Sequence, residues 1–248
     1  MKNASESIEI EHFNTTFEQL SNAQKPESVK IECFNAISER LFNTKEHALL
    51  GISPFNSYYV KENLEKLFSW ALNTFKEITV FIPNEIAVYT LQAVGYPQQK
   101  AEKKTRRQDH YLKNKAIKAL ITSGLSEIEA QDKIVCLSDL TSNKVYIKLC
   151  NHCRDLYKND NSFRNGCFLT SKWVLDGKCL GSTVENEQLD VAVQYFLAEL
   201  PLYLDTPGIL GVPSSLFVYK DPLPDFLQKI YIENLLVSPN QGYMMVNV

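Results

Sequence analysis

The segment that most constrains the fold of this chain is residues 48–59, Ala-Leu-Leu-Gly-Ile-Ser-Pro-Phe-Asn-Ser-Tyr-Tyr. An apolar run over residues 48–52 leads into a Gly-x-Ser-Pro turn. A helical pattern follows, and its apolar positions share one face at the 3.6-residue period: Val60, Leu64, Leu67, Phe68, Ala71 and Phe75. The segment predicts a strand, a tight turn and a helix. In open α/β sheets ligands bind beyond the carboxyl ends of the strands, so Ser53 in the turn is a candidate for chemistry.

A simpler interpretation is that Ser53 only marks a loop, because Ser and Pro are common turn residues. The nucleophile elbow of α/β hydrolases has the pattern Gly-x-Ser-x-Gly, and Phe55 stands where that pattern has its second glycine. The turn alone therefore does not decide between the two interpretations.

The remaining hydrophobic pattern alternates strands with helices. We expect strands at 77–83, 134–137 and, last in the chain, 215–219, and loops at 177–182 and 206–213. We expect helices at 31–42, 84–95 with Asn84 as N-cap, 126–133, 142–156, 163–175, 185–200 closed by Pro201, and 226–236. This alternation predicts an α/β fold with a mainly parallel sheet and helices on both faces.

Length and composition favour one domain. The 248 residues are 44% hydrophobic and carry a net charge of −3, which suits a globular chain with a sizeable core. We expect a polar N-terminal arm over residues 1–28 and a single domain over 29–248. No apolar stretch approaches the roughly 20 residues that span a bilayer, and we find no signal peptide, so we expect a cytoplasmic protein without a membrane partner.

The cysteines raise the question of a metal site. Cys150 and Cys153 have the Cys-x-x-Cys spacing of a zinc site, but they lie in an expected helix and no second pair completes a tetrahedral set. We expect no metal, and reduced thiols at all six positions: Cys33, Cys136, Cys150, Cys153, Cys167 and Cys179.

The most biased segment is residues 100–118, with eight basic residues against two acidic ones. At 100° per residue Lys100, Lys104, Arg107, Tyr111, Lys115 and Lys118 form one stripe, and Leu112, Ala116 and Leu120 lie opposite. The helix is therefore expected to present a basic ridge to polyanions and to pack its back on the core. A solvated charged face is the plain alternative, although such faces usually mix signs.

Tyr195 and Glu199 are four residues apart in an expected helix, so they lie one above the other at the border of its apolar stripe. Such a pair suits a pocket and equally suits the surface.

Several separated segments resemble the tRNA-dependent cyclodipeptide synthase family. They are Gly51-Ile-Ser-Pro-Phe-Asn56, Tyr195-Phe-Leu-Ala-Glu-Leu-Pro201, Asp205-Thr-Pro-Gly-Ile-Leu-Gly-Val-Pro213, the strand ending at Tyr219, and Asn240-Gln-Gly242. They occur in the family's order and cover residues 48–242. The resemblance implies a Rossmann-like sheet similar to the catalytic domain of class I aminoacyl-tRNA synthetases.

The resemblance also implies a reaction. Two aminoacyl-tRNAs would yield a cyclic dipeptide by a ping-pong route, through an aminoacyl-enzyme and a dipeptidyl-enzyme on Ser53. Tyr195 and Glu199 would hold the α-amino group, and Tyr219 would relay protons. Because the amino acids arrive activated, neither ATP nor a cofactor is expected, and the sequence has no standard nucleotide-binding motif.

The substrate contacts are expected as follows. Gly51 would leave room beside the serine, and Asn56 would orient the loop or cap the next helix. A hydrophobic pocket for the first residue would be lined by Leu49, Phe81, Leu202 and Phe217, which are also ordinary core types. The basic ridge would bind the tRNA acceptor arm through Lys100, Lys103, Lys104, Arg106, Arg107, Lys115 and Lys118.

One residue departs from the family pattern. Lys220 follows the relay tyrosine, where much of the family has His or Pro, so the loop geometry at this point does not follow from the resemblance. We expect a monomer.

Two other functions stay open at this stage. A serine esterase or peptidase would need a base beside Ser53, yet the four histidines (His12, His47, His110 and His152) all lie outside the late loops that usually supply it. A non-catalytic tRNA-binding module would keep the ridge but would not need Ser53, Tyr195, Glu199 and Tyr219 together.

Overall fold

The computed structural model describes residues 29–176, 186–234 and 236–248. The predicted arm at 1–28 and the predicted loop at 177–182 lie outside the described residues. The strands are β1 (Lys30–Cys33), β2 (His47–Gly51), β3 (Glu77–Ile82), β4 (Ile134–Cys136), β5 (Ser215–Tyr219) and β6 (Gln241–Asn247). The helices are α2 (Ala36–Thr44), α3 (Lys61–Thr74), α4 (Ala87–Ala93), α5 (Gln98–Thr122), α6 (Glu127–Asp132), the 3₁₀ helix η1 (Leu137–Leu140), α7 (Lys144–Asn159), α8 (Asn161–Asp176), α9 (Asn186–Leu210) and α10 (Asp225–Ile232).

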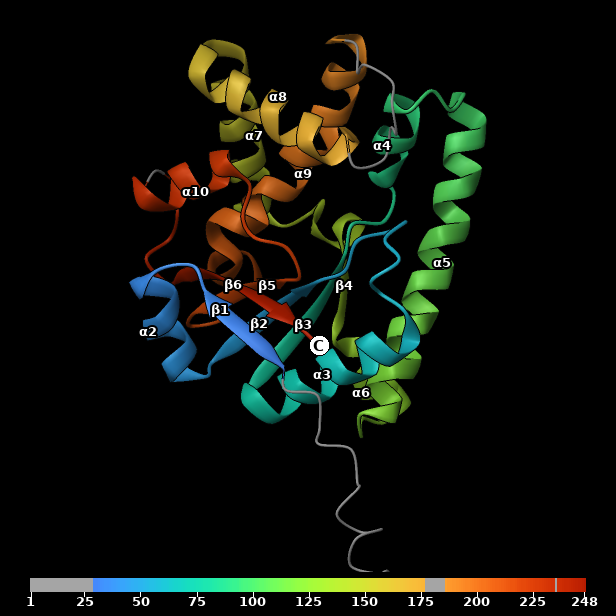
Figure 1. Ribbon diagram of the computed structural model, residues 1–248, viewed down its shortest axis with the longest axis vertical. Coiled ribbons are helices and arrows are strands. Elements are labelled where there is room, and N and C mark those ends of the chain that lie inside the picture. Colours follow the sequence, from blue (N-terminus) through green and yellow to red (C-terminus); the bar gives the residue numbers. More distant parts are fainter. Residues whose placement is uncertain (1–28, 177–185, 235) are drawn as a thin grey trace, which may run out of the picture.

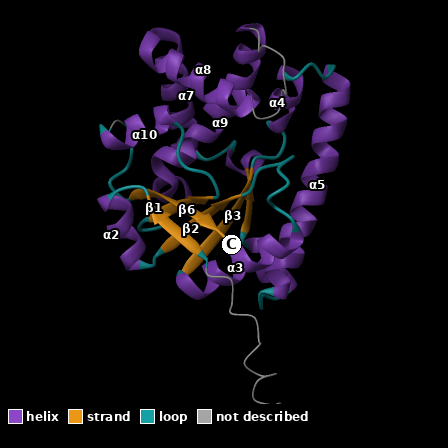
Figure 2. Cartoon of the chain, in the orientation of Figure 1, coloured by secondary structure: helices purple, strands orange, loops and turns teal. Residues whose placement is uncertain are grey.

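The strands form one sheet in the order β1-β6-β5-β2-β3-β4, and Figure 2 shows the strands in orange. All neighbouring pairs are parallel except β1 with β6. The chain runs outward from β2 to β3 and β4, and later adds β5 on the other side of β2. The strand order therefore reverses between β2 and β5, which is where open α/β sheets bind ligands. The expected mainly parallel α/β sheet is confirmed.

Alternate residues of each central strand pack on opposite faces, as the two-residue period of a strand requires. In β2, Ala48 and Leu50 pack with α3, α5 and α6, whereas Leu49 packs with α7, α9 and α10. In Figure 1, α5 runs along one side of the molecule, and α7, α8 and α9 gather at the top of the view. Helices therefore cover both faces.

The expected helix at 31–42 is wrong over its first residues. Lys30–Cys33 is instead the edge strand β1, in which Ile31 is paired with Val246 of β6. β1 spans only four residues, too few for its alternation of polar and apolar residues to outweigh the helical spacing of Ile31, Phe34, Ile37 and Leu41. β6 was missed as well, although the apolar run at 243–246 follows a turn-prone Asn-Gln-Gly.

Pro201 does not close its helix as expected. Helix α9 continues past this buried proline and breaks at Asp205, whose backbone is non-helical (φ −156°, ψ 60°). An interior proline costs about 3 kcal/mol, but Leu200, Leu202 and Leu204 are fully buried around it and favour continuation. The Asp205 side chain then accepts a hydrogen bond from the Gly208 amide, at 3.0 Å. This bond begins the last turn of α9, at 206–210, where we expected a loop.

Asn84 is not an N-cap. The N-terminal boundary of α4 falls at Ile86, which makes no side-chain capping bond. The Asn84 amide instead exchanges hydrogen bonds with Ser138, at 2.9 and 3.2 Å, and ties the end of β3 to η1.

Candidate active site

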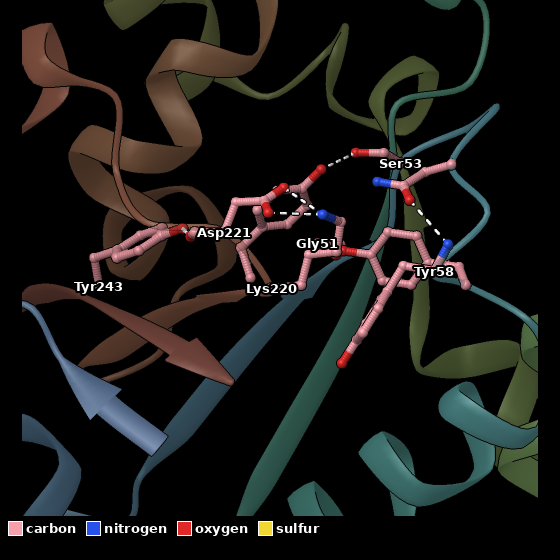
Figure 3. A network of polar contacts seen from close by, with 9 residues as sticks. Gly51, Ser53, Tyr58, Lys220, Asp221 and Tyr243 are labelled. Carbon is pink, nitrogen blue, oxygen red and sulfur yellow. Dashed lines mark hydrogen bonds and ion pairs between the residues drawn. The ribbon is translucent and has the colours of Figure 1, made fainter. Parts of the chain in front are cut away.

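Ser53 lies just beyond the carboxyl end of β2, beside the reversal of strand order (Figure 3). Tyr219 is the last residue of β5, the neighbouring strand. The hydroxyl groups of Ser53 and Tyr219 are joined by a hydrogen bond. Two groups predicted to act in one reaction therefore come from the two strands that flank the reversal.

Three contacts fix the loop that carries Ser53. The Tyr59 hydroxyl donates to the Gly51 carbonyl at 2.9 Å, and the Tyr58 amide donates to Asn56 Oδ1 at 3.0 Å. On its outer side the Lys115 ammonium of α5 donates to the Tyr59 carbonyl at 2.8 Å. Asn56 shapes the loop through this local bond and does not cap α3, whose boundary residue is Val60.

Gly51 makes room for aromatic rings rather than for the serine itself. A Cβ atom at this position would lie 2.9 Å from the Phe217 ring and 3.4 Å from the Tyr219 ring. Glycine thus lets both side chains of β5 approach β2, and this brings Tyr219 within reach of Ser53.

Tyr195 and Glu199 form a hydrogen-bonded pair on α9, in which the phenol donates to Glu199 Oε1 at 2.8 Å. Both line the same cavity as Ser53 and Tyr219. Their spacing suited a pocket and the surface equally, and in the structure the pair lies in a pocket. Burial raises the pKa of the Glu199 carboxyl to about 8, although the Tyr195 bond acts in the opposite direction. Burial likewise raises the pKa of Tyr219 to about 12. Both shifts favour the protonated forms of these groups at neutral pH.

The cavity has a volume of about 660 Å³ and an aromatic floor. Of the four predicted pocket residues, Phe81 and Phe217 line it. Leu49 and Leu202 do not; they are buried in the core with α7 and α10.

The lining residues that the sequence analysis did not assign to the cavity include Tyr203, Tyr243, Lys220 and Asp221. Tyr203 follows Glu199 by one helical turn, and extending the Tyr195–Glu199 spacing by four residues would have found it. Its ring stacks on Phe217 with centroids 4.1 Å apart. Tyr243 comes from the strand that the sequence analysis missed.

Lys220, the residue that departs from the family pattern, forms an ion pair with its neighbour Asp221 at 2.6 Å. The Tyr243 hydroxyl donates to the backbone carbonyl of Asp221, so this loop is anchored to β6 (Figure 3). Lys220 therefore lines the cavity with its charge neutralised by Asp221.

The basic ridge lies on α5 as expected, with Leu112, Ala116 and Leu120 fully buried behind it. Six of the seven predicted tRNA contacts are exposed: Lys100, Lys103, Lys104, Arg106, Arg107 and Lys118. Two of the seven, Lys104 and Lys115, have partners within the chain. Lys115 supports the Ser53 loop, and Lys104 donates to the Tyr96 hydroxyl at 2.9 Å.

No histidine lines the cavity among the residues that the structure describes. His47 is buried at the start of β2, where its ring nitrogens contact Ser215 Oγ at 2.8 Å and Thr79 Oγ1 at 3.0 Å. Burial and nearby Lys133 lower the pKa of His47 to about 4, so it bridges three strands as a neutral ring. His47 pairs with Ser215 outside the cavity, and no histidine of the described residues pairs with Ser53 as a hydrolase base would.

Metal binding and membrane insertion are two further properties on which the described residues bear. Residues 29–176, 186–234 and 236–248 include no cluster of three His, Cys, Asp or Glu that could hold a metal ion. In the same ranges no helix is long and apolar enough to cross a membrane.

The sequence profile of the cyclodipeptide synthase family matches residues 29–248, most of the chain. The chain belongs to this family. It is 32% identical to the cyclo(L-leucyl-L-leucyl) synthase of Bacillus subtilis (strain 168) over 207 residues, 81% of this chain and 82% of that protein. It is also 32% identical to the cyclo(L-tyrosyl-L-tyrosyl) synthase of Mycobacterium tuberculosis over 212 residues, 81% of this chain and 69% of the relative.

Solved structures of the family share its fold. A cyclodipeptide synthase from Bacillus thermoamylovorans matches with a TM-score of 0.82 and 29% identity, over 89% of this chain and 96% of that one. A Mycobacterium tuberculosis structure, described as demonstrating that these enzymes are related to type I tRNA synthetases, matches with a TM-score of 0.77 and 28% identity over 91% and 95% of the two chains. The expected Rossmann-like, synthetase-related fold is thereby confirmed. A cyclodipeptide synthase from Candidatus Glomeribacter gigasporarum, solved bound to Phe-tRNAPhe, shares the fold at a TM-score of 0.53 and 15% identity over 82% and 88%.

Proposed function

We propose that this chain joins the aminoacyl groups of two aminoacyl-tRNAs into a cyclic dipeptide, with Ser53 as the covalent nucleophile. The observation that carries the proposal is the hydrogen bond between Ser53 and Tyr219 in the cavity that also holds the Tyr195–Glu199 pair. A nucleophile, a proton-relay group and a site for an amine are the parts that two successive acyl transfers need.

In the first step Ser53 Oγ attacks the carbonyl carbon of the aminoacyl ester. The bond between that carbon and the 3′-terminal ribose oxygen breaks, and the ribose oxygen takes up a proton. Serine is a weak nucleophile without a base, and no described histidine lies beside it. We propose that the neighbouring hydroxyl of the terminal ribose helps to move the proton while Tyr219 holds Ser53 in place.

Glu199 and Tyr195 receive the α-amino group of the bound residue. An ammonium ion beside Glu199 favours the carboxylate and offsets the burial that keeps it protonated. The same burial that raises the pKa of Glu199 also disfavours separated charges in the cavity, so a proton can pass from the ammonium to Glu199 and free the amine for attack.

The neutral amine then attacks the ester of the second aminoacyl-tRNA. A C–N bond forms, the bond to the second ribose oxygen breaks, that oxygen takes up the proton that the amine loses, and a dipeptidyl ester remains on Ser53. The free amine of this dipeptide attacks the Ser53 ester, the ring closes, and Ser53 regains its proton through Tyr219. Every carbonyl arrives as an ester, so the sequence of steps uses no ATP, cofactor or metal.

The substrates are inferred from the ridge, the cavity and the relatives. The exposed cations of α5 suit a tRNA acceptor arm, whose binding rests largely on its phosphates. Tyr203, Phe217 and Phe81 give an apolar floor that suits a hydrophobic first residue, as the leucyl and tyrosyl products in the names of the relatives also do. All these groups come from one chain, which is consistent with a monomer, and charged tRNAs place the reaction in the cytoplasm.

The test is mass spectrometry of the medium from bacteria that express the chain or its Ser53→Ala variant. Cyclic dipeptides from the first culture and not from the second support the proposal. A hydrolase would instead release free amino acids from purified aminoacyl-tRNA, and a non-catalytic binding module would leave the charged tRNA intact. Either result contradicts the proposal.

A further inference from the structure

A row of three side chains connects the basic helix with the mouth of the cavity. Tyr96, in the connection before α5, accepts a hydrogen bond from Lys104. The Lys104 ammonium lies 4.5 Å from the centroid of the Tyr96 ring and 5.6 Å from that of Phe55. Phe55 lines the cavity, two residues beyond Ser53. The row therefore runs from the basic ridge to the loop that carries Ser53.

The backbone of Phe55 is unusual. Its φ is +58°, in the left-handed region that bulky residues seldom adopt. This is the position at which the hydrolase elbow has its second glycine, a residue that adopts this conformation without strain. A phenylalanine here costs conformational energy, and such strain is common where a side chain serves a functional site. The benzyl group is thereby placed at the edge of the cavity under a lysine.

We infer that Phe55, with Lys104 and Tyr96, forms the seat for the single-stranded 3′ end of the aminoacyl-tRNA, with a terminal base stacked on Phe55. The inference rests on the proposed function. It gives Phe55 and Tyr96 a positioning role that neither the reaction chemistry nor the basic ridge requires, and it assigns Lys104, a ridge residue, to the phosphates of the 3′ end.

The geometry of the substrate supports this assignment. The reacting ester is on the terminal ribose, so when it meets Ser53 the attached base must lie within a few ångströms of that residue. Two residues of chain span at most about 7 Å, which places the Phe55 ring in the same range. Unpaired bases stack on aromatic side chains, and cationic side chains beside them contact the phosphates between successive nucleotides.

The site differs in kind from the ridge. The exposed ridge cations meet phosphates and are sensitive to salt, whereas stacking depends on the base and little on salt. The chain offers a matched control on the same helix: Lys115 lies 4.5 Å from the centroid of Tyr111, a second lysine–aromatic pair. Tyr111 is 58% exposed and does not line the cavity.

The experiment uses the full chain and a fluorescein-labelled CCA trinucleotide, with affinity measured by fluorescence anisotropy. We expect Phe55→Ala to weaken binding about tenfold, Phe55→Trp to restore it, and Tyr96→Ala to weaken it about threefold. Tyr111→Ala should change it less than twofold. A second probe of the same length with an abasic 3′ residue tests stacking directly, since Phe55→Ala should then have less than a twofold effect.

Three outcomes overturn the inference: equal binding of CCA by the wild type and Phe55→Ala, an equal loss with the abasic probe, or failure of Phe55→Trp to rescue. The last two would show that Phe55 only shapes the loop. The experiment is independent of the chemistry. If cyclic dipeptides form but Phe55 does not affect CCA binding, only this inference fails, whereas a base-dependent Phe55 effect in a chain that never acylates Ser53 contradicts only the proposed reaction.

Discussion

The hydroxyl groups of Ser53 and Tyr219 share a hydrogen bond, although 166 residues separate them in the chain. The parallel pairing of β2 with β5 sets their distance, and the absence of a side chain at Gly51 permits it. The Tyr219 phenol is protonated at neutral pH, and burial raises its pKa further, to about 12, so it can donate to Ser53 and return a proton to it.

Changing Tyr219 to Phe should slow proton transfer without removing the nucleophile. We expect kcat for cyclic dipeptide formation to fall about 100-fold or more, with little change in KM, while an acyl group still accumulates on Ser53. Rapid-quench single-turnover kinetics with charged tRNA separate the steps. Equal slowing of Ser53 acylation and of ring closure would contradict this prediction and show that Tyr219 already acts in the first acyl transfer.

Changing Glu199 to Gln should weaken catalysis and strengthen the fold. The folded-state pKa of about 8 lies above the ordinary value of 4.5, so between these pH values the folded chain holds a proton that the unfolded chain releases. The stability due to this group is present below pH 4.5 and is lost as the pH rises through 8.

Glu199→Gln should therefore gain stability relative to the wild type as the pH rises from 5 to 9, by a few kcal/mol at most, while kcat/KM falls about 100-fold. Urea unfolding at several pH values measures the first effect. If the difference in unfolding free energy between Glu199→Gln and the wild type does not vary with pH, the pKa of Glu199 in the folded chain is not raised.

The exposed cations of α5 should set the salt dependence of tRNA binding. Lys103, Arg107 and Lys118 are exposed, so changing all three to Ala should leave the fold intact. Each lost phosphate contact reduces the slope of log K against log salt by about one. A matched control changes three exposed lysines of α7 (Lys144, Lys148 and Lys158) to Ala. Equal slopes for the two triple variants would place the tRNA elsewhere.

His47 should make the fold sensitive to acid. Its folded-state pKa of about 4 lies below the ordinary 6.5, so the unfolded chain binds the proton first. The stability due to neutral His47 is fully present above pH 6.5 and declines as the pH falls to about 4, by about 3 kcal/mol. Urea unfolding of the wild type and His47→Gln at pH 7, 5 and 4 tests this. Parallel pH profiles for the two proteins would contradict it.

The parts of the site that depend on local sequence were predicted. The turn at Ser53 follows an apolar run and precedes a periodic helix, and Tyr195 and Glu199 are related by helical spacing alone. Pairings between distant segments were not. The edge strand at Ile31 exists because Val246 lies beside it, and neither segment alone predicts the other.

The errors have the same origin. Leu49 and Phe81 are both apolar strand residues that face the same side of the sheet. Phe81 lies near the carboxyl end of β3, where the cavity is, whereas Leu49 lies deeper in β2 and only packs in the core. The helix continues through Pro201 because tertiary burial outweighs local propensity. The Lys220–Asp221 pair and Tyr243 reach the cavity through the arrangement of β5 and β6, which no local pattern encodes.

The most direct test of the proposed mechanism is the mass of the intact protein after mixing with charged tRNA. We predict an increase equal to one aminoacyl residue, mapped by peptide sequencing to Ser53 and missing from Ser53→Ala, which should still bind tRNA. Hydroxylamine should remove the label, because it is an ester. A label on another residue, or cyclic dipeptide made by Ser53→Ala, would contradict the account.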